Sequence, residues 1–160
     1  MRIRNLLVAT ALAGVLASPS FAQTAEKYQE LSEQLVAEAS GAMTSEQAKE
    51  AQALYERALV ANPANIDALI GLGKAHEAQG RVGSGLKYYR KALELEPNDK
   101  NALEYQALAF LKRNLRARAE SNRDKLASLC TEGCEELDTV ASAIEEFSAR
   151  KADAGAHTEG

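Results

Sequence analysis

The strongest constraint on the fold is a repeat in the middle of the chain. The segment from Leu54 to Leu69 recurs at Tyr88 to Leu103, and the fixed offset between the two is the repeat period. Random pairing of average compositions would match roughly one position in such a window. Here six positions match: Tyr55/Tyr89, Ala58/Ala92, Leu59/Leu93, Pro63/Pro97, Ala68/Ala102 and Leu69/Leu103. A fixed period of about 34 residues is typical of a helical solenoid, in which each unit buries its apolar face by stacking on the next.

The composition favours an all-α fold. Strong helix formers such as Ala, Leu, Glu, Lys and Gln dominate, whereas Trp is absent and there are only five Tyr and three Phe. The β-branched runs expected of strands do not occur in the sequence. A length of 160 residues fits one domain of ordinary size.

The spacing of apolar residues and helix breakers predicts a chain of antiparallel helical hairpins. An N-terminal helix is expected within 23–43, with Gly41 as its stop. A second helix is expected from Thr44, because Thr44 and Gln47 have capping-box spacing, to just before Pro63. The connections between later segments are only a few residues long, so neighbouring helices must run antiparallel.

The later helices have their own start and stop signals. Asn65 is expected to cap a third helix that ends near 80, and a fourth covers 82–95. A fifth starts near Asp99 and runs to about 113, and Asn114 is the expected cap of a sixth that ends near 129. A seventh shows Leu137, Val140, Ile144 and Phe147 on one stripe within 130–151. The small, polar tail 152–160 is expected to be disordered.

The segment 1–22 has the layout of a secretory signal peptide. Basic residues Arg2 and Arg4 precede an apolar run from Leu6 to Ala17, and small residues flank Phe21. We therefore expect cleavage after Ala22 and export to the periplasm. The alternative is a permanent N-terminal anchor, but the apolar run is shorter than the ~20 residues that span a bilayer.

The charge of the chain argues against two classes of partner. Cleavage would remove two of the 19 basic residues and none of the 23 acidic ones, which leaves a formal net charge of about −6. Neither nucleic acid nor an anionic lipid surface would be attracted to such a chain at long range. No later apolar run is long enough for stable membrane insertion.

The best repeat unit, from Ile66 to Asp99, resembles the tetratricopeptide repeat. It carries Leu69, Leu72-Gly73, His76, Gly80, Gly85, Tyr89, Ala92 and Pro97 at the matching places. The resemblance covers 44–129 and implies a short right-handed solenoid with a C-terminal capping helix. The unit from Lys100 is degenerate because Arg123 stands where an aromatic residue is expected. The segment 25–41 does not align without an insertion, so the N-terminal helix is expected to lie outside the repeats.

In such repeats the first helix of each hairpin lines a concave groove that binds peptides or protein partners. Leu69, Leu72 and His76 define the core stripe, so the residues between them should face the groove. The resemblance thus implies the following partner-binding residues: Asp67, Ile70, Lys74, Glu77, Asn101, Glu104, Leu108, Leu111 and Lys112.

Two alternatives bear on that assignment. Leu108 and Leu111 could instead pack on a terminal helix of the same chain, because short solenoids need caps. A subset of the family grips the C-terminal carboxylate of a client with Lys and Asn side chains, and Ile70, Glu104 and Leu108 are unsuited to that. A general peptide groove is the remaining expectation.

The only cysteines, Cys130 and Cys134, lie in an expected turn between two helices. In an oxidising compartment so close a pair most simply forms a disulfide, and Gly133 makes the bend feasible. A redox-active pair is the alternative, but the spacing is not C-x-x-C and no strand–helix context surrounds it. Haem attachment would need His where Glu135 stands, and zinc would need further ligands. We therefore expect no metal and no cofactor.

The sequence contains no nucleophile motif and no glycine-rich phosphate loop, so we do not expect an enzyme. The leading hypothesis is a periplasmic protein-interaction scaffold, with envelope or pilus assembly as the process that the resemblance suggests. The alternatives are a thiol–disulfide carrier that uses Cys130 and Cys134, or a self-associating structural protein in which the inner face forms a homo-oligomer seam.

Overall fold

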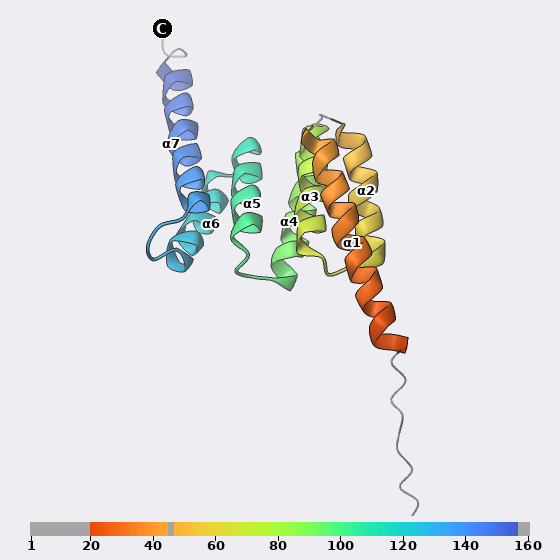
Figure 1. The fold of residues 1–160 in the computed structure, drawn as a ribbon. Helices are drawn as coiled ribbons and strands as arrows, with labels where there is room; N and C mark the ends of the chain where they lie inside the picture. Colours follow the sequence, from red (N-terminus) through yellow and green to blue (C-terminus); the bar gives the residue numbers. More distant parts are fainter. Residues whose placement is uncertain (1–19, 45–46, 157–160) are drawn as a thin grey trace, which may run out of the picture.

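In the computed structural model, residues 20–44 and 47–156 are described, and this part of the chain consists of seven α-helices and no strand (Figure 1). Their bounds are α1 Ser20–Thr44, α2 Ala48–Ala61, α3 Ile66–Ala78, α4 Val82–Leu95, α5 Lys100–Lys112, α6 Arg116–Leu129 and α7 Glu135–Ala156. The helices form three successive hairpins, α1–α2, α3–α4 and α5–α6, and α7 packs on the last of them. The expected all-α repeat fold is confirmed.

The sequence predicts a signal peptide at one end of the chain and a disordered tail at the other. Most of the expected signal peptide, residues 1–19, lies outside the described residues, and 20–22 form the start of α1. At the other end α7 continues to Ala156, so residues 152–156 of the tail are helical rather than disordered. None of the helices in the described ranges combines the length and the hydropathy that a membrane-spanning helix needs.

Two of the four predicted caps are correct. The side chain of Asn65 accepts a hydrogen bond from the backbone N–H of Ala68 at 2.9 Å, and Asp99 does the same for Ala102 at 2.7 Å. Pro63 and Pro97 lie in the preceding turns. These side chains satisfy backbone donors that a helix start leaves without a partner, which fixes where α3 and α5 begin.

The other two predicted caps are wrong. Helix α1 continues through Gly41 to Thr44, and α2 begins after Gln47, whose side chain makes no capping bond. A glycine inside a helix costs only ~1 kcal/mol, which the packing of α1 on α2 outweighs. Asn114 adopts a left-handed conformation with φ of 58°, so it turns the chain, and Leu115 is the residue that precedes α6.

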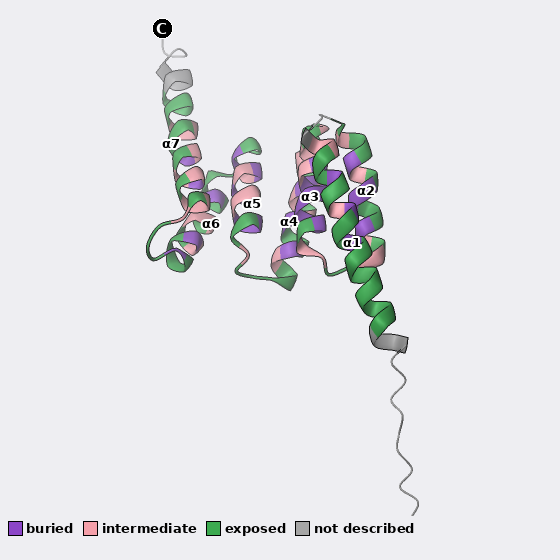
Figure 2. Ribbon diagram, viewed as in Figure 1, coloured by how far each residue is buried: buried purple, intermediate pink, exposed green. Residues whose placement is uncertain are grey.

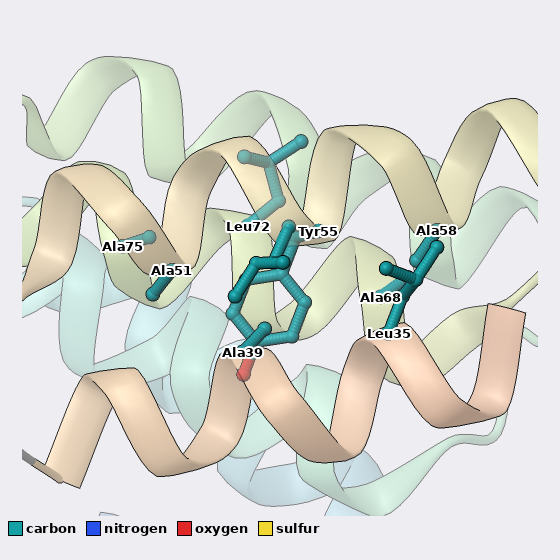
Figure 3. Packing of buried hydrophobic residues seen from close by; sticks show 9 residues of the cluster. Leu35, Ala39, Ala51, Tyr55, Ala58, Ala68, Leu72 and Ala75 are labelled. Carbon is teal, nitrogen blue, oxygen red and sulfur yellow. The ribbon is translucent and has the colours of Figure 1, made fainter.

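Helix α1 is the first helix of a hairpin in register with the repeat, without the insertion that we expected. Leu35 and Ala39 lie one repeat period before Leu69 and Gly73, and like them they are buried. Figure 3 shows Leu35 and Ala39 facing Tyr55 and Ala58 of α2 and Leu72 of α3. The repeat therefore extends one helix further upstream than the sequence pattern indicated.

The C-terminal helix continues the same register. Leu137 lies one repeat period after Leu103, and Val140 and Ile144 are buried against α5 and α6. The outer face of α7 carries exposed polar residues such as Asp138, Ser142 and Glu145. Helix α7 thus lies where the first helix of a fourth unit would, and its polar outer face closes the stack as the expected cap.

In the described residues the core consists of three apolar clusters, and buried residues appear as purple segments of the helix ribbons in Figure 2. The first lies between α1, α2 and α3, the second between α3, α4 and α5, and the third between α5, α6 and α7. Glycine makes the middle junction possible, because a Cβ on Gly73 would lie 2.4 Å from the Tyr89 ring, and one on Gly85 would lie 2.8 Å from the carbonyl oxygen of Gly73.

Candidate peptide-binding groove

A continuous groove runs along the first helices of the hairpins. It consists of three pockets, which we name the α1 pocket, the central pocket and the α7 pocket. The α1 and central pockets share Lys74 and Tyr105, and the central and α7 pockets share Leu108 and Lys112. Because adjacent pockets share lining residues, they adjoin one another: the α1 and central pockets lie between α1, α3 and α5, and the α7 pocket lies between α5 and α7.

The central pocket, of about 310 Å³, holds a connected polar network. Glu77 accepts a hydrogen bond from the Tyr89 hydroxyl on one carboxylate oxygen and from the Lys112 ammonium on the other, both at 2.6 Å. Lys74 donates to the Tyr105 hydroxyl at 3.3 Å and lies 4.5 Å from the centre of that ring. Met43, Ala78 and Leu108 complete the apolar wall.

Burial and the bond to Glu77 raise the pKa of Tyr89, so this hydroxyl stays protonated and donates to the carboxylate at every physiological pH. The ring itself is fully buried and forms the floor of the central pocket, stacked on Tyr105 with 6.1 Å between the ring centres. The network therefore links α3, α4 and α5 at the central pocket through Glu77, Tyr89 and Lys112.

The α1 pocket is more polar. Its wall includes Ser40, whose hydroxyl lies 3.2 Å from the hydroxyl of Tyr55, together with exposed Asp67 and Asn101. Tyr55 reaches this pocket because Gly71 leaves room: a Cβ there would lie 2.2 Å from the Tyr55 ring. In the next unit the residue equivalent to Gly71 is Tyr105, so an aromatic ring occupies that place.

The α7 pocket, of about 360 Å³, lies where α5 meets the capping helix. Its lining residues are Leu108, Leu111, Lys112, Ala143, Glu146 and Arg150. Leu111 is also buried against Ile144 in the third core cluster. The docking of α7 on the last hairpin therefore creates this end of the groove.

A model of the tetratricopeptide repeat matches this chain twice, over residues 36–100 and 72–121. Together the two matches cover more than half of the chain. This protein belongs to the tetratricopeptide repeat family. No curated protein matches its sequence.

Solved structures of tetratricopeptide repeat proteins share the fold. The type III secretion chaperone SycD of Yersinia enterocolitica, in complex with a peptide of the translocator YopD, superposes with a TM-score of 0.65 at 23% identity over 74% of this chain and 93% of that one. The Sgt2 repeat domain of Aspergillus fumigatus superposes with a TM-score of 0.68 at 22% identity, over 78% of this chain and 81% of that one. PcrH, in complex with the chaperone-binding region of PopD, superposes with a TM-score of 0.63 at 20% identity, over 74% of this chain and 92% of that one.

The structure brings eight of the nine residues proposed for partner binding into this groove. Leu108 and Lys112 line two of the three pockets each, and the buried Ile70 contributes to the α1 pocket. Leu111 lines the α7 pocket but also packs on the capping helix, which is the alternative stated above for this residue. The others are Asp67, Lys74, Glu77 and Asn101.

Glu104 is the exception, because it is not among the lining residues of the three pockets. It is half-buried on α5 near the start of α7. Burial, followed by the negative charges of Glu136 and Glu135, raises the pKa of Glu104, and Lys74 opposes that shift. Glu104 is thus within electrostatic range of both the start of α7 and Lys74 of the groove.

Sequence reasoning missed several groove residues that the repeat period identifies. Val36, Ser40 and Met43 lie one period before Ile70, Lys74 and Glu77, and all three line the groove. Extending the repeat into α1 would have found them. Tyr105 was missed for another reason: its equivalent in the preceding unit is Gly71, so the period gave no sign of an aromatic wall.

The expected Cys130–Cys134 disulfide is present, with 5.7 Å between the Cα atoms. It closes the turn between α6 and α7, where Gly133 has φ of 88°. Glu136 lies close to both sulfur atoms and could complete a three-ligand metal site only if the bond were reduced. In the oxidised form the bridge ties the capping helix to α6.

Proposed function

We propose that this protein is an interaction scaffold that binds a segment of a partner protein in the groove formed by α1, α3, α5 and α7. The observation that carries the proposal is the row of adjoining pockets, of which the central and α7 pockets combine apolar lining with charged residues. Proteins of this repeat family mediate protein interactions and are typically not enzymes, and two of its structural neighbours hold a peptide or a binding region of a translocator protein.

The groove has the features of a binding surface with a few dominant contacts. Tyr105, Leu108 and Met43 offer apolar contact area in the central pocket, and the α1 and α7 pockets adjoin it. Binding energy in protein interfaces concentrates in such pockets, above all where aromatic residues line them. An extended partner segment could place successive side chains in successive pockets.

The test is a paired substitution, Lys74→Glu with Leu108→Asp, followed by affinity capture from an envelope extract after crosslinking. We expect loss of the captured partner with unchanged helicity by circular dichroism. Lys87→Glu with Lys91→Glu, on exposed positions of α4, is the matched control and should leave capture intact. Capture that survives the groove substitutions would refute the binding site.

We further propose that the chain acts in the periplasm after cleavage at Ala22, in envelope or pilus assembly. The sequence layout of residues 1–22 supports export, and an oxidising compartment is where disulfides such as Cys130–Cys134 persist. N-terminal sequencing of the protein recovered from a periplasmic fraction should start at Gln23. A chain that begins at Met1 in the cytosolic fraction would contradict export.

The disulfide also keeps a second role open, that of a thiol–disulfide carrier. Cys130 is only 9% exposed, which favours a structural bridge. A reduction potential below about −300 mV would exclude the carrier role. A self-associating groove is the third hypothesis, and sedimentation would exclude it if the protein stays monomeric at high concentration.

A further inference from the structure

The groove is electrically polarised along its length. In the α1 pocket the charged lining residues are the exposed Asp67 and the half-buried Lys74. At the other end the α7 pocket passes into a distal pocket that shares Leu111 and Arg150 with it and adds Phe147 and Lys151. The cations there are Arg150, Lys151 and Lys112, of which Lys112 pairs with Glu77, and Glu146 is the exposed carboxylate among the described lining residues. In a chain with more acidic than basic residues, this grouping of cations departs from the average surface.

The main anionic group of the central pocket, the Glu77 carboxylate, is already engaged within the protein. Both carboxylate oxygens of Glu77 already accept hydrogen bonds, from Tyr89 and Lys112. Aromatic rings attract cations, but Lys74 of the protein itself lies over the Tyr105 ring. A ligand in this pocket meets the apolar wall of Met43 and Leu108 and the ammonium of Lys112, whose side chain is 58% exposed although it pairs with Glu77.

We infer that the groove selects an acidic, apolar partner segment: an apolar side chain enters the central pocket, and carboxylates on one side of it meet Lys112, Arg150 and Lys151. This inference rests on the proposed groove function and specifies its ligand. Charge complementarity of this kind determines partner choice and orientation more than total affinity. The test below distinguishes an acidic segment from three other possible occupants of the groove: a basic segment, a neutral segment and a second copy of this chain.

The test is selection of random dodecapeptides displayed on phage against the purified full chain, followed by anisotropy titration of synthetic copies of the winners. We expect winners that contain both a large apolar residue and Asp or Glu. Lys112→Gln with Arg150→Gln should weaken their binding about three- to tenfold, as expected for two partly exposed ion pairs. Lys87→Gln with Lys91→Gln removes the same charge from α4 and should leave binding unchanged.

The outcomes separate this inference from the proposed function. Selected peptides that lack carboxylates but no longer bind the Leu108→Asp variant would overturn the acidic ligand and leave the groove in place. The same conclusion would follow if the peptides bound the Lys112→Gln, Arg150→Gln variant as tightly as they bind the control variant. Failure to select any peptide, or winners that are indifferent to Leu108→Asp, would overturn the groove function and this inference with it. Circular dichroism of each variant checks that it is folded.

Discussion

At the scale of single residues, the packing of the two helices within a hairpin depends on small residues opposite aromatic rings. Ala39 and Gly73 are equivalent positions of successive units, and they provide the space into which Tyr55 and Tyr89 pack. In the third unit the equivalent pair is Ala107 and Arg123, without a ring. A complete unit therefore needs both members of the pair: a tyrosine on its second helix and a small residue opposite it on its first helix.

Gly73→Ala should destabilise the fold, because its Cβ would meet the fully buried Tyr89 ring, which Glu77 holds by a hydrogen bond. We expect a loss of about 1–3 kcal/mol in the free energy of unfolding, measured by urea denaturation. Gly41→Ala is the control: a Cβ there meets no atom within 4 Å, so this change should raise stability by about 0.5–1 kcal/mol. Equal effects at the two glycines would contradict the packing role of Gly73.

His76 makes stability depend on pH. It is 6% exposed, stacks on Tyr88, and neither ring nitrogen has a hydrogen-bond partner within the described residues. Burial, followed by the charge of Arg81, lowers the pKa of His76 below its usual value of 6.5, and Glu56 opposes the shift. The unfolded chain therefore binds the proton more readily, and stability falls as the pH drops below 6.5.

His76→Phe should remove this part of the acid sensitivity. The phenyl ring keeps the stack on Tyr88 and carries no nitrogen to bury, so we expect a gain of about 1 kcal/mol at pH 7.5 and a larger one at pH 5.5. Urea denaturation of both proteins at the two pH values measures the difference. An equal gain at both values would show that His76 does not titrate on unfolding.

At the scale of elements, α7 is both a cap and part of the groove. It covers the apolar faces of α5 and α6 through Val140 and Ile144, and it presents Ala143, Glu146 and Arg150 to the α7 pocket. The Cys130–Cys134 disulfide at the start of α7 limits how far this helix can move when it detaches from α5 and α6. Loss of the bridge should therefore weaken the cap without abolishing it.

The double substitution Cys130→Ser with Cys134→Ser should lower the free energy of unfolding by about 2 kcal/mol, the value expected for so short a loop in the chain-entropy picture. Hydrogen exchange should rise more in α7 than in α3, which belongs to an earlier hairpin. Treating the wild-type protein with a dithiol reductant should reproduce the effect. Uniform acceleration over all helices would mean that the bridge does not act locally.

At the scale of the molecule, a stack of repeats has no single core. Each cluster joins only neighbouring hairpins, so stability is close to a sum of units and junctions. The groove also depends on the contacts between neighbouring hairpins, because its pockets lie between stacked helices. Its ends are accordingly the parts most sensitive to the loss of a terminal helix.

Removal of α7 by ending the chain at Leu129 should expose the third cluster and leave the first two intact. We expect α5 and α6 to lose protection from hydrogen exchange by at least about tenfold while α1 to α4 keep most of theirs, because each unit contacts only its neighbours. Hydrogen exchange with mass spectrometry on both chains provides the comparison. Collapse of protection in α2 and α3 would show that the stack folds as one cooperative unit.

What the linear pattern determined is the local part of the structure: the all-α class, the repeat from Ile66 to Asp99, and the starts of α3 and α5. These follow from side chains that act on their own neighbours in sequence, such as the caps Asn65 and Asp99. The end of α1 and the turn at Asn114 did not follow, because helix ends there depend on packing and on backbone conformation.

The groove was decided by tertiary structure. The repeat period placed Lys74, Leu108 and Lys112 on one face. The central pocket, however, also needs Tyr105 from the following unit, and the α7 pocket needs Arg150 from the capping helix. Those residues come together only when hairpins stack, because a pocket is a space between elements and no single element encodes its walls. The sequence by itself thus determined the unit and its inner face, and the stacking determined which side chains meet there and where the charge of the groove lies.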